Sequence, residues 1–195
     1  MAMISNRYAE AFAYALELHR EQVRKGTNIP YISHLISVSG LVLEHGGTEV
    51  EAIAALLHDA VEDQGGPPTL AEIRRRFGDE VAAIVEGCSD TDVTPKPPWR
   101  KRKENYVARV CHAPRSVRLV SAADKLHNAR SILADYRLLG EAVWSRFTGG
   151  KDGTLWYYRA LVAAYRDAAG DPIPMALLTE LDRVVTELEQ KPASH

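Results

Sequence analysis

Cysteine is scarce in this sequence, and long apolar runs are missing from it. Only Cys88 and Cys111 occur among 195 residues, which gives no support to a disulfide framework or a thiolate zinc site. No apolar stretch approaches the roughly 20 residues that span a bilayer, and the N-terminus lacks the basic and then apolar layout of a secretory signal. We therefore expect a cytoplasmic protein that does not enter a membrane.

An excess of charge of either sign is also missing. Lys and Arg number 24 and Asp and Glu 26, for a formal net charge of -2, so the chain as a whole has no bias toward nucleic acid. The hydrophobic fraction of 46% fits a globular protein, and this length favours a single domain over 1–195. These quantities leave the oligomeric state open.

The sequence contains no convincing run of alternating apolar and polar residues, whereas apolar residues recur at spacings of three and four almost throughout. This periodicity predicts an all-α fold, a compact bundle of about eight to ten helices. The predicted helices are 5–25, 33–46, 48–62, 69–77, 79–89, 98–111, 115–135, 140–147, 154–169 and 173–191. Thr48 and Thr69 are predicted N-caps, and a loop is expected over 146–154.

The stretch "AALLHDAVEDQGG" begins as an apolar helix and then carries four polar groups without a lysine. Successive residues of a helix are about 100° apart, so these four side chains share one face when 53–63 is placed on a helix. They are His58, Asp59, Glu62 and Asp63. Asp59 and Asp63 repel each other as a like-charged i,i+4 pair, and a divalent cation would relieve this repulsion. The alternative is a packed core histidine followed by a solvated helix end.

Two more residues of ligand type lie in apolar helical surroundings. His34 lies in "YISHLISVSGLVL", and Asp124 lies in "RLVSAADKLHNARSIL", where a buried acid needs a partner. With His58 and Asp59 they would offer two imidazoles and two carboxylates, with coordination positions left open for water and a phosphate oxygen. Mixed nitrogen and oxygen ligands suit manganese, iron or zinc better than magnesium or calcium. A lone histidine such as His34 is otherwise more often a packed residue.

Basic residues recur beside these motifs. Arg24 and Lys25 precede the "GTNIP" loop, and four consecutive cations at 100–103 occur in "PPWRKRKENY". Cations at a helix N-terminus oppose the helix dipole, so an anionic ligand would explain the second cluster. The alternative for that cluster is a solvated helix start.

In these features the sequence resembles the HD-domain metal-dependent phosphohydrolases, whose ligand pattern matches His34, His58-Asp59 and Asp124. The strings "HDAVEDQ", "FGDEVAAIVEG" and "AADKLHNARS" resemble one branch in particular, the hydrolase domain of the RelA/SpoT homologues, which includes small alarmone hydrolases. The resemblance covers about 8–160 and implies an HD-type bundle. The remaining chain has room for a closing helix over about 173–191 and not for a synthetase domain.

The resemblance implies a role for each matching residue. The expected metal ligands are His34, His58, Asp59 and Asp124, and the metal is usually Mn²⁺ in this branch, with Fe²⁺ and Zn²⁺ as alternatives. Glu62 and Asp63 match the acidic pair that orients or deprotonates the attacking water. The residues expected to contact the nucleotide are Arg24, Lys25, Lys101, Arg102, Asn128, Ser131 and Tyr158.

The chain also departs from the family pattern. Leu35 follows the first ligand histidine where the family usually has proline, and Gln64 follows the acidic pair where it usually has threonine. Cys88 and Ser89 replace the usual Val-Thr, and the segment at 140–158 is longer than in a minimal alarmone hydrolase. These departures touch the surroundings of the expected nucleotide and none of the expected ligands.

The leading reaction implied by the resemblance is removal of the 3′-pyrophosphate from guanosine tetra- or pentaphosphate by metal-dependent hydrolysis. One alternative is hydrolysis of another phosphorylated small molecule, such as a nucleoside monophosphate or NADPH. The other is a nucleotide-binding module without turnover. The presence of all four expected ligands together with Glu62 and Asp63 argues against the second alternative.

Overall fold

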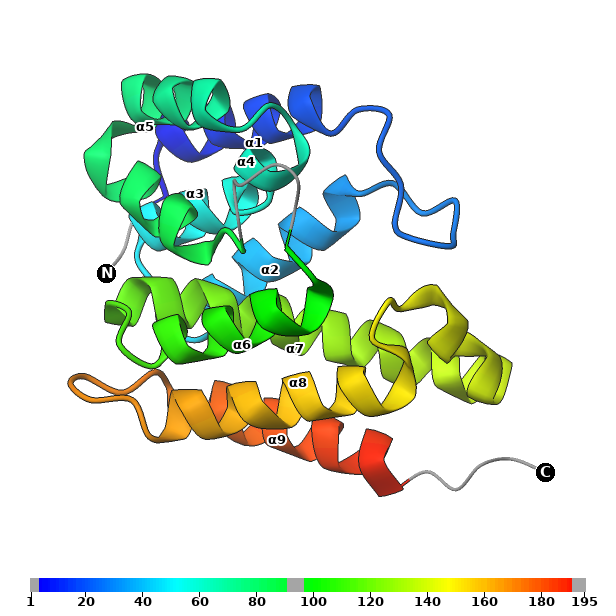
Figure 1. The fold of residues 1–195 in the computed structure, drawn as a ribbon. Helices are drawn as coiled ribbons and strands as arrows, with labels where there is room; N and C mark the ends of the chain where they lie inside the picture. The colour runs from blue at the N-terminus through cyan, green and yellow to red at the C-terminus, as the bar shows by residue number, and fades with distance from the viewer. Residues whose placement is uncertain (1–3, 91–96, 191–195) are drawn as a thin grey trace.

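Helices form nearly all of the regular structure in residues 4–90 and 97–190, the part of the chain that this computed structural model describes (Figure 1). In chain order they are α1 (Asn6–Leu18), α2 (Ile32–Glu44), α3 (Glu49–Leu57), α4 (Ala60–Asp63), α5 (Pro67–Cys88), α6 (Trp99–Val110), α7 (Arg115–Leu139), the 3₁₀ helix η1 (Gly140–Arg146), α8 (Gly150–Arg166) and α9 (Met175–Gln190). Within those ranges the only β-structure is an isolated bridge between Val23 and Pro30. The predicted all-α fold is confirmed.

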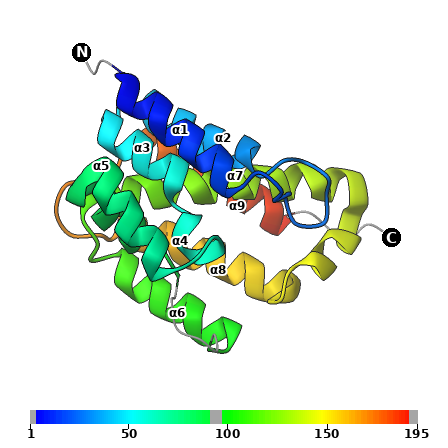
Figure 2. The ribbon, with the colours of Figure 1, turned by 90° about the horizontal axis from the view of Figure 1, so that it is seen from above.

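The long helix α7 is the centre of the fold. It packs against α2, α3 and α5 on one side and against α8, α9 and η1 on the other, so the N-terminal helices form one layer and α8 and α9 another (Figures 1 and 2). Leu119, Val120 and Leu126 of α7 are completely buried between these layers. Across 4–90 and 97–190, no helix has both the length and the apolar character needed to cross a membrane.

The chain bends at the HD dipeptide, where the sequence predicts one continuous helix over 48–62. Helix α3 begins after Thr48, the predicted N-cap, which forms a capping box with Glu51, but it ends at Leu57. His58 is its C-cap, and Asp59 precedes the single turn of α4. The prediction of one continuous helix is wrong, because His58 and Asp59 form a turn between α3 and α4, although Asp59 keeps right-handed backbone angles of φ -95° and ψ -6°.

Other boundaries also differ from the prediction. Helix α1 ends at Leu18, and the chain then runs through a loop to α2. Helix α5 joins the two helices predicted at 69–77 and 79–89 across a kink at Gly78, whose φ of 84° favours glycine. It starts at Pro67, a residue suited to the first helical position. Thr69 is therefore not an N-cap, and its hydroxyl donates to the carbonyl of Gln64.

The loop predicted over 146–154 is shorter than expected, because α8 already begins at Gly150. The indole of Trp99 lies where a side chain at Gly149 or Gly153 would be: a Cβ on Gly149 would come within 2.5 Å of the ring. The glycines of this stretch thus allow α6 and α8 to approach each other, rather than marking a long loop.

Candidate functional site

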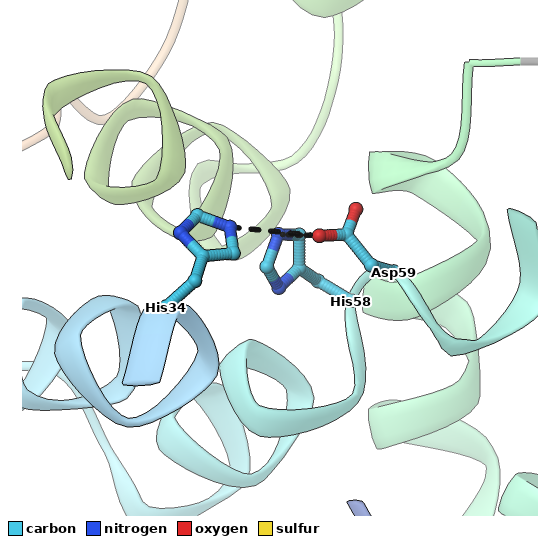
Figure 3. Close-up of side chains that lie close together, drawn as sticks. All are labelled: His34, His58 and Asp59. Atoms are coloured by element: carbon cyan, nitrogen blue, oxygen red, sulfur yellow. Dashed lines mark ion pairs between the residues drawn. The ribbon is translucent and has the colours of Figure 1, made fainter. Parts of the chain in front are cut away.

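Three side chains converge at the break between α3 and α4. His34 comes from the first turn of α2, His58 from the C-cap of α3, and Asp59 from the next position along the chain (Figure 3). One ligand atom from each lies within 4.8 Å of the others. Asp59 Oδ2 is 3.0 Å from His58 Nε2 and 3.5 Å from His34 Nε2.

Asp124 reaches the same place from α7. Its Oδ1 lies 3.2 Å from His34 Nε2 and 3.6 Å from His58 Nε2, so the four residues predicted as ligands are brought together. Both histidines are buried, and neither Nε2 atom has a hydrogen-bond partner. Buried polar atoms are almost always satisfied, and two orphaned imidazole nitrogens facing two carboxylates therefore fit a bound divalent cation.

The two carboxylates of the cluster are ionised, so positive charge beside them stabilises the site. Burial opposes the ionisation of Asp59, yet the nearby His58 and His34 hold the pKa of its carboxyl well below the usual value. Burial also opposes ionisation of Asp124, and Lys125 together with the two imidazoles holds its pKa well below the usual value. Two ionised carboxylates side by side, one buried and one partly buried, are costly unless positive charge compensates them. A divalent cation coordinated by all four groups would do so.

Each candidate ligand is oriented by a neighbour. His58 Nδ1 lies 2.8 Å from the carbonyl oxygen of Ala55, which leaves Nε2 to face the cluster. The hydroxyl of Tyr31 donates to Asp59 Oδ2 at 2.6 Å. Such outer contacts fix the orientation of metal-binding side chains and strengthen them as ligands.

Asp124 and His34 have their own outer partners on α7. Asn128 Nδ2 donates to Asp124 Oδ1 at 2.5 Å. His127 Nδ1 lies 2.8 Å from His34 Nδ1. Burial, together with the positive charge of the nearby Arg24, lowers the pKa of His127 to about 4, so this imidazole is neutral at pH 7.

The acidic pair of α4 divides between two environments. Glu62 lines the cavity described below. Asp63 Oδ2 accepts a hydrogen bond of 2.8 Å from Gln22, which in turn accepts one of 2.6 Å from Gln64. Burial and the negative charge of Asp59 raise the pKa of the Asp63 carboxyl. Gln64, the departure from the family threonine, thus contacts the residue that orients Asp63.

A cavity of about 640 Å³ lies beside the cluster, within the size range of small-molecule sites. Its charged lining comprises the cations Arg24, Lys25, Arg102, Lys103, Lys125 and Arg146 and the carboxylates Glu62 and Asp135. Its aromatic lining comprises Tyr31, Trp99, Phe147, Tyr157 and Tyr158. Six cations against two carboxylates suit an anionic ligand, and the aromatic faces suit a planar ring.

Most of the residues predicted to contact a nucleotide line this cavity. They are Arg24, Lys25, Arg102, Asn128, Ser131 and Tyr158. Lys101 does not: it is exposed and lies outside the lining. Helix α6 begins at Trp99, and positions three and four residues later share the face of Trp99, so Arg102 and Lys103 face the cavity and Lys101 faces elsewhere.

The cavity cations are held in place by specific partners. Arg24 donates to Asn128 Oδ1 at 2.7 Å, and Lys103 contacts the buried carboxylate of Asp90 at 2.8 Å. Arg146 pairs with Asp135 at 2.7 Å. These contacts fix the positive groups before any ligand arrives, which reduces the ordering cost of binding.

Sequence reasoning missed one wall of the cavity. Arg146 ends η1, Phe147 and Thr148 follow it, and Tyr157 lies on α8, so the long segment at 140–158 forms this wall. No short motif marks these residues. Their position depends on η1 folding back beside α7 and α8.

Comparison with known proteins identifies the family of the chain. The family model of the HD domain matches residues 11–155. The chain therefore belongs to the HD domain family, and its all-α fold with clustered histidines and aspartates fits that family.

Two curated relatives carry the name guanosine-3′,5′-bis(diphosphate) 3′-pyrophosphohydrolase MESH1. The one from Danio rerio is 41% identical over 127 residues, covering 63% of this chain and 67% of the relative. The one from Xenopus tropicalis is 38% identical over 126 residues, covering 63% and 68%. The bifunctional (p)ppGpp synthase/hydrolase SpoT of Escherichia coli is 33% identical, but the match covers only 18% of that protein.

Two solved structures share the fold. One, described as a metazoan ortholog of SpoT that hydrolyzes ppGpp, aligns with a TM-score of 0.76 at 24% identity, over 96% of this chain and 98% of that one. A crystal structure of a Listeria monocytogenes protein aligns with a TM-score of 0.72 at 31% identity, over 81% of this chain and 99% of that one.

Proposed function

We propose that this chain is a metal-dependent phosphohydrolase that removes the 3′-pyrophosphate of guanosine 3′,5′-bis(diphosphate). One observation carries the proposal: a cavity lined by six cations lies beside a His-His-Asp cluster whose two imidazoles are buried. The 3′-pyrophosphohydrolases among the relatives support this substrate. A guanosine that carries two diphosphates presents both the negative charge and the planar base for which this cavity is suited.

His34, His58, Asp59 and Asp124 would hold the divalent metal. When bound there, it supplies the Lewis acidity that lowers the pKa of a water and polarises a phosphoryl oxygen. Manganese is the metal we expect, since two imidazoles and two carboxylates suit it, with iron and zinc as alternatives.

The chain's own residues would supply the proton transfer and the phosphate contacts. Glu62 lines the cavity and takes a proton from the attacking water, while Asp63, held by Gln22, orients it. Water oxygen bonds to the phosphorus attached at the ribose 3′ position, and the bond from that phosphorus to the ribose oxygen breaks. The ribose oxygen takes up a proton, so the products are GDP and pyrophosphate.

The cavity cations would neutralise the diphosphates before and during this step. Arg24 and Lys25 lie on the loop before α2, whereas Arg102 and Lys103 lie on α6. Fixed positive groups of this kind stabilise developing charge without reorganisation. The aromatic side chains leave an apolar surface for the base.

The test is product analysis with metal-free protein to which Mn²⁺, Fe²⁺ or Zn²⁺ is added back. Anion-exchange chromatography separates the guanosine products, and phosphorus NMR identifies pyrophosphate. We expect GDP and pyrophosphate with Mn²⁺ and neither with the Asp59→Asn variant. The proposal fails if no guanosine product forms with any metal while a nucleoside monophosphate or NADPH releases phosphate.

A further inference from the structure

His127 contacts the ring nitrogen of His34 that points away from the site cluster. It lies on α7, three positions after Asp124, and its Nδ1 is 2.8 Å from His34 Nδ1. The two rings have centroids 4.8 Å apart. His34 is completely buried, so water does not replace this contact. His127 also belongs to the lining of the cavity.

A hydrogen bond between two imidazole nitrogens needs one proton, and the metal centre decides which ring carries it. His34 Nε2 faces Asp59 and Asp124, and it can bind a metal only through its lone pair. The proton of a neutral His34 then has to lie on Nδ1. His127 Nδ1 must accept it, and the proton of His127 must lie on its other nitrogen, Nε2.

His34 differs in this respect from the other ligand imidazole. His58 Nδ1 faces the backbone carbonyl of Ala55, an acceptor that no substitution removes. The acceptor of His34 is instead a side chain with two tautomers, of which only one fits the metal-binding form.

We propose that His127 is a positioning residue for the metal centre, which accepts the Nδ1 proton of His34 and so keeps His34 Nε2 available as a ligand. This inference rests on the proposed function only in requiring that the wild-type chain binds a divalent metal. His127 contacts neither the metal nor the reacting phosphate in this role. It acts through His34.

Metal affinity of the protein prepared without metal tests the proposal. His127→Phe keeps a ring of similar size and removes the acceptor, and we expect it to weaken Mn²⁺ binding in calorimetry roughly 10- to 100-fold, the usual cost of losing an outer partner. His127→Gln offers an amide oxygen as acceptor and should recover part of that loss. An affinity of His127→Phe within twofold of the wild type would overturn the proposal.

A matched control is His45→Phe, because His45 lies at the other end of α2 and its Nδ1 contacts only the carbonyl of Leu41 among the described residues. This variant should bind Mn²⁺ as the wild type does. If the wild type itself binds no metal, the proposed function fails, whereas wild-type binding that is insensitive to His127 refutes this inference alone.

Should His127→Phe not fold, nitrogen NMR of the wild-type protein loaded with diamagnetic Zn²⁺ decides the question. We expect the long-range spectrum of His34 to show a protonated Nδ1, and that of His127 to show a protonated Nε2 and an unprotonated Nδ1. The opposite placement of the proton on His127 would overturn the proposal.

Discussion

Two groups of charges in this molecule consist of similar residues in opposite environments. The site cluster, formed by His34, His58, Asp59 and Asp124, is buried except for the partly exposed Asp59, and it leaves both imidazole Nε2 atoms without hydrogen-bond partners. The α8–α9 ion pairs join Arg159 to Asp182 and Glu189, and Arg166 to Asp182, on a partly exposed surface.

This difference distinguishes charges that serve metal binding from charges that serve only stability. In the α8–α9 ion pairs each guanidinium already has its carboxylate, and exposed pairs contribute little free energy because water screens them. The site cluster instead brings two carboxylates beside two imidazole Nε2 atoms that make no hydrogen bond, and Lys125 and the imidazoles already favour the ionised carboxylates. A cation is the missing partner, so we expect the site cluster to respond to metal and the α8–α9 ion pairs not to.

The largest effect should follow from removing a ligand charge. Asp59→Asn keeps the shape of the side chain but removes the carboxylate that lies closest to His58 Nε2. We expect kcat for guanosine tetraphosphate to fall at least about 10²- to 10³-fold, the scale for losing a group that acts on the transition state. The free energy of unfolding of the metal-free protein should fall, because the lowered pKa of Asp59 means that its ionised carboxylate is favoured in the folded state.

Asp182→Asn is the matched change in the α8–α9 ion pairs, and it should leave kcat within twofold of the wild type. Steady-state kinetics and urea unfolding of both variants provide the comparison. An active Asp59→Asn protein would contradict the assignment of the site cluster.

Metal removal should separate the same two regions without any substitution. A ligand that binds only the folded state at 100 times its Kd adds about 2.7 kcal/mol of stability, and about 1 kcal/mol changes the Tm of a chain of this size by roughly 2–4 °C. We therefore expect saturating Mn²⁺ to raise the Tm by roughly 5–10 °C in thermal unfolding. Chelation should reverse the shift.

Asp182→Asn should show the same metal-dependent rise in Tm as the wild type. Asp59→Asn should show little or none. An equal rise in all three proteins would place the metal outside the site cluster.

Arg24 connects the cavity to the site cluster and should have an intermediate effect. Its guanidinium donates to Asn128, which donates to the ligand carboxylate of Asp124. Loss of a hydrogen bond to a charged group costs about 1.5–3 kcal/mol, so Arg24→Gln should lower kcat/KM for guanosine tetraphosphate roughly 10- to 100-fold.

Lys101→Gln is the control for Arg24→Gln, because it removes an exposed cation that lies outside the cavity lining. We expect its kcat/KM to stay within twofold of the wild type. A large loss for Lys101→Gln and none for Arg24→Gln would mean that the nucleotide binds elsewhere.

Lys101 also illustrates what the sequence can and cannot predict. Helical spacing and the four ligand-type residues predict the all-α fold and the convergence of α2, α3 and α7. The position of Lys101 depends on where α6 begins, and a helix start that differs by one residue turns every following side chain by about 100°. The break after Leu57 is a similar case, since no glycine or proline marks it.

Contacts between distant segments explain the remaining differences. Nothing in the spacing of "DKLHN" distinguishes the role of His127 from that of an ordinary polar residue, because its partner His34 lies 93 positions earlier. The wall formed by Arg146 and Phe147 depends likewise on how η1 packs against α7. Local patterns predict the helices and their buried faces, whereas the cavity arises only when those helices pack.

The smallest effect should come from breaking the α8–α9 ion pairs. Arg159→Gln removes the cation that contacts both Asp182 and Glu189, and we expect it to lower the free energy of unfolding at pH 7 by up to about 1 kcal/mol, as for other exposed pairs. Turnover should not change. Arg159→Lys, which keeps the charge but loses the two-pronged contact, should lie between the wild type and Arg159→Gln.

The pH dependence of this loss has a definite sign. Arg159 and then Arg166 lower the pKa of Asp182, so the folded state favours the ionised carboxylate more than the unfolded state does. That stabilisation is complete above the ordinary pKa of an aspartate, near 4, and disappears as the pH falls through the lowered value. Urea unfolding should therefore show the wild type and Arg159→Gln converging toward pH 2. A gap that stays unchanged in acid would mean that Arg159 stabilises the chain through packing rather than through charge.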